Sequence, residues 1–193
     1  MLYDTVVEKD CTVECLYLDE RLRDEMRRFI KERIIQNLEA TKRLLELGED
    51  HIDTCVGIYT YAIEEYGKIL FLNGLRPTAE KNNKLRVRYA HRNNGFRDHE
   101  HKFNLALNDK YLPASCKVLL EDGGLTASGF EASGFITETR TRPDMKTRMS
   151  VFYADFDEND NYKSILKSPE VKRKLFVTAI DAFLQHIRVQ RYP

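Results

Sequence analysis

Two long segments near the start of the chain carry apolar residues at the spacing of one helical face. In DERLRDEMRRFIKERIIQNLEATKRLLELGED these residues recur every three or four positions: Leu22, Met26, Phe29, Ile30, Ile34, Leu38 and Leu45. The spacing predicts a helix over about residues 20–47, with Gly48 as its C-terminal stop. DHIDTCVGIYTYAIEEYGKILFLNGLRP predicts a second helix over about residues 50–74. Because the connection is short, we expect the two helices to pack antiparallel.

The middle of the chain predicts shorter helices. Residues 78–93, which include Leu85, Val87 and Tyr89, predict a weak third helix. FRDHEHKFNLALNDKYL predicts another helix over about residues 96–111.

The last third of the chain predicts an irregular segment followed by a helix. GGLTASGFEASGF is rich in glycine and serine, which predicts a loop over about residues 123–134. TRMSVFYADF is rich in β-branched and aromatic residues and predicts a short strand over about residues 147–156. SPEVKRKLFVTAIDAFLQHIRVQRY predicts a helix over about residues 169–191, with Ser168 as its N-cap.

The predicted fold class is all-α, a helical bundle in a single domain over residues 1–193. Residues 1–18 are expected to be an N-terminal extension, and residues 122–160 a loop and strand insert before the C-terminal helix. The length suits one domain, and a hydrophobic fraction of 42% is enough for a sizeable core.

Charge and composition narrow the classes of partner. Lysine and arginine number 31, as do aspartate and glutamate, so the formal net charge is zero. A nonspecific polyanion binder is usually basic, so contact with RNA must come from a local patch. No apolar run is long enough for a signal peptide or for a membrane-spanning helix, so we expect a cytoplasmic protein with no membrane partner. Its four cysteines form no C-x-x-C pair and are expected to be reduced thiols.

Two adjacent acids in the second predicted helix have different surroundings on a helical wheel. At 100° per residue, Glu65 falls between Leu72 and Ile58, whereas Glu64 falls on the most polar side. We therefore expect Glu65 to be largely buried and paired, and Glu64 to be more exposed. A buried carboxylate needs a partner, and Lys68 is one candidate. A purely structural Glu65–Lys68 pair at the rim of the bundle is the alternative.

The stretch AHRNNGFRDHEHK, residues 90–102, concentrates three histidines and two arginines. On the wheel of the predicted helix, His99 lies at the edge of the apolar side, beside Phe103 and Ala106. Arg97 and His101 point the other way. We therefore expect His99 to sit in a partly dry environment, which can tune its proton affinity, and His101 to be solvated.

Basic residues around His99 suggest chemistry on a phosphate. Arg92 and Asn93 precede the helix, whose N-terminus carries partial positive charge, and Lys102 follows His99 by one turn. A histidine can exchange the proton of an attacking or leaving oxygen, while Arg92 binds the phosphate and Lys102 adds positive charge. This combination suits in-line cleavage of RNA with no cofactor and no metal. An ordinary polar helix cap is the alternative.

An all-helical domain with Arg92-Asn93 followed by His99 resembles the HEPN superfamily (higher eukaryotes and prokaryotes nucleotide-binding). Within it, the chain looks most like the AbiV abortive-infection group. YAIEEYGKILFL (61–72) resembles that group's Ala-Ile-Glu-Glu-x-Gly-Lys segment, and FRDHEHK (96–102) its segment with His and Lys. RMSVFYADFDEN (148–159) looks like the short Tyr-x-Asp strand that often follows. The similarity covers about residues 20–190.

The resemblance implies a role in phage defence and RNA cleavage by a homodimer that brings two motifs together. The site would comprise Arg92, His99 and Lys102, supported by Glu64, Glu65, Lys68 and Asn93. The stretch also permits a match through Arg97 and His101. Some HEPN proteins are noncatalytic, so the second hypothesis is a binding protein that blocks translation or another process through a phage or host protein or a nucleotide. A metal-dependent hydrolase is a weaker third, because the chain lacks a second Glu-x-x-His pair.

Overall fold

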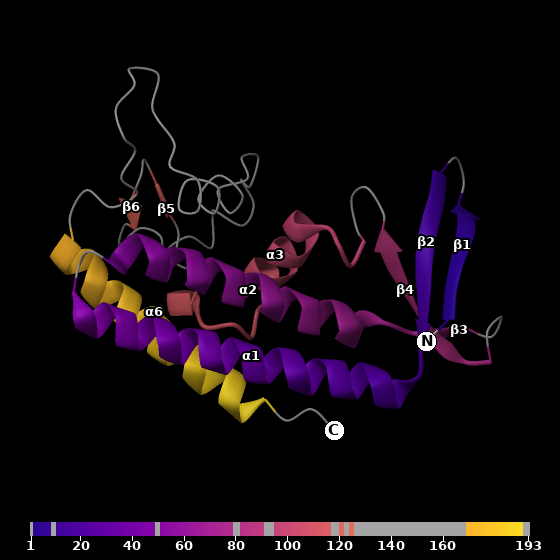
Figure 1. The fold of residues 1–193 in the computed structure, drawn as a ribbon, viewed down its shortest axis with the longest axis horizontal. Coiled ribbons are helices and arrows are strands. Elements are labelled where there is room, and N and C mark those ends of the chain that lie inside the picture. Colours follow the sequence, from indigo (N-terminus) through magenta and orange to yellow (C-terminus); the bar gives the residue numbers. More distant parts are fainter. Residues whose placement is uncertain are drawn as a thin grey trace, which may run out of the picture.

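The computed structural model describes residues 2–8, 11–48, 51–78, 82–90, 95–116, 120–121, 124–125 and 169–190. The elements in chain order are β1 (Leu2–Glu8), β2 (Cys11–Leu18), α1 (Glu20–Leu47), α2 (Ile52–Gly74), β3 (Pro77–Thr78), β4 (Lys84–Ala90), α3 (His99–Asn108), η3 (Ala114–Cys116), β5 (Leu120–Glu121), β6 (Gly124–Leu125) and α6 (Pro169–Val189). Long helices dominate, and a small sheet lies at one end of them (Figure 1).

The two long helices α1 and α2 form the predicted antiparallel pair (Figure 1). α1 begins at Asp19, whose carboxylate accepts a hydrogen bond from the amide of Leu22 at 2.7 Å. This bond satisfies one of the amides that lack a partner at a helix start. α1 ends at Gly48, whose φ of 140° lies in a region that favours glycine. Both predicted helices are confirmed, and only the start of α2 lies two residues later than predicted.

The C-terminal helix α6 packs on the α1–α2 pair and completes the main core. Phe183 of α6 is fully buried and makes edge-to-face contacts with Tyr59 and Tyr66 of α2, at centroid distances of 6.0 and 5.7 Å. Lys31 of α1 donates a hydrogen bond of 2.6 Å to the carbonyl oxygen of Gln190, which follows the end of α6. The predicted helix over residues 169–191 is thus confirmed. Ser168 lies outside the described residues.

A four-stranded antiparallel sheet, in the order β1-β2-β4-β3, corrects the all-α expectation. The fold is mostly helical but not all-α, and the segment 1–18 supplies two of the strands. The prediction of a helix over residues 78–93 is wrong. Leu85 and Val87 are buried and alternate with Arg86 and Arg88, which is the two-residue period of a strand. The two apolar side chains join the main core from the sheet.

The residues directly before α3 are hydrogen-bonded to β4 through their backbone. The amide of Phe96 donates to the carbonyl oxygen of Arg88 at 2.7 Å, and that of Arg97 to Tyr89 at 3.1 Å. α3 then starts at His99 rather than near residue 96, because Asp98 is its N-cap. The predicted helix over residues 96–111 is therefore present but shorter.

Parts of the predicted insert over residues 122–160 can be located. Within it, β6 pairs with the preceding β5 in a separate two-stranded sheet. The strand predicted over residues 147–156 lies outside the described residues. Among the helices of the described residues, none has the length and apolarity needed to cross a membrane.

Candidate functional site

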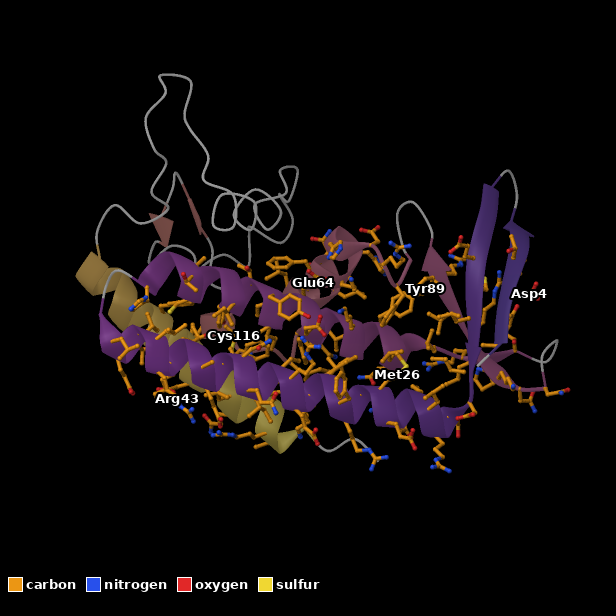
Figure 2. The ribbon with its side chains drawn as sticks, viewed as in Figure 1. Asp4, Met26, Arg43, Glu64, Tyr89 and Cys116 are labelled. Carbon is orange, nitrogen blue, oxygen red and sulfur yellow. The ribbon has the colours of Figure 1, made fainter. Side chains whose placement is uncertain are left out.

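Glu64 and Glu65 are both buried in α2, with 3% of each residue exposed. The prediction for Glu65 is confirmed, since it is buried and forms an ion pair with Lys68. The prediction that Glu64 is the more exposed of the two is wrong. The helical wheel places Glu64 on the polar side of α2, but α3 packs against α2 and covers it (Figure 2).

The close approach of α3 depends on Gly67. A Cβ atom added to Gly67 would lie 1.8 Å from the backbone oxygen of Lys102. The hydrogen atom of glycine therefore lets the backbone of α3 rest directly on α2. Glu64 lies three residues before Gly67 and His99 three residues before Lys102, so this contact brings the acid and the histidine to the same place.

Three side chains meet at this contact, and we call them the Glu64 cluster: Glu64, His99 and Lys102. Oε1 of Glu64 lies 2.7 Å from Nδ1 of His99 and 3.0 Å from Nζ of Lys102. Only 2% of Lys102 is exposed, whereas 51% of the His99 side chain is exposed. The cluster therefore has a buried ionic base and one side chain that reaches the surface.

The Glu65–Lys68 pair lies within electrostatic reach of the cluster. Burial lowers the pKa of Lys102, and the charge and hydrogen bond of Glu64 oppose this shift. Lys68 lowers the pKa of Lys102 further, while Glu65 raises it. Two acids on α2 are thus matched by two lysines, which limits the cost of burying the charges.

The bond to Glu64 orients the imidazole of His99. A carboxylate only accepts hydrogen bonds, so Nδ1 must carry the proton that it shares with Glu64. Proton exchange with another molecule then falls to Nε2 of the same ring. An imidazole held in this way by an acid can serve as a general base or a general acid.

His101 has different surroundings from those expected. Its ring packs edge-on against Phe71 of α2, with centroids 5.9 Å apart, and it is half-buried rather than solvated. Burial lowers the pKa of His101, and Asp98 partly opposes this shift. The prediction failed because Phe71 covers the side of α3 that the wheel leaves polar. His99, and not His101, forms the hydrogen bond to the buried carboxylate of Glu64.

The structure describes one of the two arginines of residues 90–102. Arg92 and Asn93 lie outside the described residues. Arg97 is exposed, and its guanidinium carbon lies 5.7 Å from the ring centroid of Tyr89 in β4. This cation–π contact holds the side chain of Arg97 against β4.

A second polar network, which the sequence analysis missed, joins α2, the end of α3 and α6. The hydroxyl of the fully buried Tyr66 donates to Asp109 at 2.6 Å and lies 3.0 Å from Nε2 of His186. Gln190 donates to the same hydroxyl at 2.9 Å. Burial lowers the pKa of His186, and Asp109 opposes this shift. These four residues come from distant parts of the chain, so no local spacing connects them.

The potential metal donors of the described residues do not form a site. Among them, no group of three or more His, Cys, Asp or Glu side chains lies close enough to hold a metal ion. Cys15, Cys55 and Cys116 are buried, and burial raises the pKa of Cys55 to about 11.

Comparisons with protein-family models, with curated proteins and with solved structures give no match. The function is therefore inferred from the chemistry of the Glu64 cluster and from the motifs of the sequence.

Proposed function

We propose that this protein is a HEPN-like ribonuclease of the abortive-infection kind, which acts in phage defence and cleaves RNA as a homodimer without a metal. The observation that supports this proposal is the 2.7 Å hydrogen bond between Glu64 and His99. It gives a half-exposed histidine the fixed orientation that proton transfer requires.

In the proposed reaction, Nε2 of His99 accepts the proton of a ribose 2′-hydroxyl. The 2′-oxygen then attacks the adjacent phosphorus, and the bond from phosphorus to the 5′-oxygen breaks. A second histidine, which is protonated, gives its proton to the leaving 5′-oxygen. The products are a 2′,3′-cyclic phosphate and a 5′-hydroxyl. The His99 of a second protomer is the simplest source of that acid, since a two-fold axis can bring two copies together.

The other residues have supporting roles in this proposal. Arg92 is the expected phosphate ligand, with Asn93 beside it. Lys102 is buried and paired with Glu64, so it acts on the reaction through that carboxylate rather than by touching the phosphate. Glu65 and Lys68 contribute to the charge balance beneath the site.

A noncatalytic binding protein is the second candidate, and the zero net charge favours it. In that case, the surface around His99 contacts a phage or host protein or a nucleotide.

The test is cleavage of a structured RNA by the purified protein in the presence of EDTA. His99→Ala should reduce the rate by about 10²–10⁴-fold, the usual loss for a general acid or base. His101→Ala is the matched control from the same helix and should cost far less, with circular dichroism confirming that both variants fold. Sedimentation should show a dimer. If the wild type cuts no RNA but still protects cells from phage, the binding-protein function replaces the ribonuclease.

A further inference from the structure

His99 and Lys102 share one acceptor atom. Both donors approach Oε1 of Glu64, at 2.7 and 3.0 Å. Lys102 follows His99 by three residues on α3, so the two side chains lie on the same face of the helix. The charge of the lysine therefore acts directly on the oxygen that holds the imidazole.

A carboxylate affects a bound imidazole in two ways. It orients the ring through the hydrogen bond, and its negative charge favours the protonated, positively charged form of the ring. The second effect works against a general base, because an imidazole that already carries both protons cannot accept another. A site that needs orientation without this extra protonation needs a second cation on the same carboxylate.

Lys102 is that cation in this protein. We propose that Lys102 is a positioning residue that keeps His99 able to accept a proton, because it neutralises the carboxylate that orients the ring. This inference extends the proposed function, and its significance for RNA cleavage rests on that function.

The other charged groups that the structure describes near His99 have partners of their own. On α2, Glu65 is adjacent to Glu64 but forms its own pair with Lys68. On α3, the carboxylate of Asp98 accepts a hydrogen bond from the amide of His101 as the N-cap. The charge of Asp98 is thus engaged by the helix start. Lys102, in contrast, contacts the oxygen that is bonded to His99.

The first test is an NMR titration of the histidine side chains in the full chain labelled with ¹⁵N. In the wild type, long-range ¹H–¹⁵N spectra should show the proton of neutral His99 on Nδ1. In Lys102→Met, the titration midpoint of His99 should rise by about one pH unit or more, a tenfold gain in proton affinity, because an unneutralised carboxylate then faces the ring. His101 in the same spectra is the internal control and should move far less. An unchanged or lower midpoint for His99 would overturn the proposal.

A second pair of variants covers the case in which Lys102→Met fails to fold. Glu64→Gln removes the carboxylate charge, and Glu64→Gln/Lys102→Met removes both charges while nearly keeping the volumes. The midpoint of His99 should be lowest in Glu64→Gln and higher in the double variant, because the positive charge of Lys102 is gone. Equal midpoints in these two variants would mean that Lys102 has only a packing role.

Activity provides a separate readout. If the protein cleaves RNA, the pH profile of cleavage by Lys102→Met should move to higher pH by the same amount as the NMR midpoint. If the wild type cleaves no RNA, the proposed function fails, while the NMR midpoints still decide the role of Lys102.

Discussion

Replacing Gly67 by alanine tests the contact on which the Glu64 cluster depends. The added Cβ would lie 1.8 Å from the backbone oxygen of Lys102, and real Cβ contacts are essentially never shorter than 3.0 Å. A backbone oxygen within a helix cannot rotate aside, so α3 must move away from α2 by about 1 Å. The 3.0 Å contact between Lys102 and Glu64 would then be too long for a good hydrogen bond.

Three effects decide the size of the change in stability. Alanine is a better helix former than glycine by about 1 kcal/mol, which favours the variant. Overpacking of a close contact costs about 1–3 kcal/mol. A weakened hydrogen bond between buried charged groups costs about 1.5–3 kcal/mol more. The free energy of unfolding of Gly67→Ala should therefore be about 1.5–5 kcal/mol below that of the wild type.

Urea unfolding at neutral pH measures this difference, and Gly74→Ala is the matched control. Gly74 is the last residue of the same helix, and nothing lies within 4 Å of a Cβ added there. That variant should be as stable as the wild type or slightly more stable. If Gly67→Ala behaves like Gly74→Ala, and the NMR signals of His99 do not change, the close contact between α2 and α3 is refuted.

Two further predictions concern the other histidines and the network around Tyr66. Tyr66→Phe should lower the free energy of unfolding by about 1–3 kcal/mol, because it deprives the half-buried Asp109 and His186 of a hydrogen-bond partner. A urea unfolding midpoint of the variant at or above that of the wild type would contradict this prediction. Burial lowers the pKa of both His101 and His186 below 6.5, so the unfolded chain takes up protons first as the pH falls. The contribution of the two neutral rings to the free energy of unfolding should therefore be fully present above about pH 6.5 and decline as the pH falls towards the lowered pKa values. Unfolding curves that coincide at pH 7.5 and 5.5 would count against the burial of these rings.

The sequence predicts the features that depend on neighbours within one element. The long helices α1, α2 and α6 follow from their apolar spacing, and the burial of Glu65 follows from its place between apolar residues on the wheel. Glu64 was misplaced because α3, not α2, buries it. Gly67 lies in the same short segment, but its role in the close contact is seen only when α3 is packed against α2.

The sheet and the Tyr66 network show the same limit in other ways. Leu85 and Val87 are too few to distinguish a period of two from a helical period, and the pairing of β4 with β2 joins residues about seventy positions apart. The Tyr66 network likewise needs Asp109 and His186 from two other elements. Long-range contacts of this kind leave no periodic pattern in a single sequence.

The return of α6 to α1 has a consequence for how the chain folds. The ion pair between Lys42 and Asp181 joins residues 139 positions apart, whereas α1 and α2 are neighbours along the chain. The helical hairpin can therefore form early, while closing the loop to α6 carries a larger entropic cost. During synthesis, the side chains of α2 that Phe183 covers remain open to water until α6 has been made. We therefore expect the newly made hairpin to be prone to aggregation until α6 packs on it.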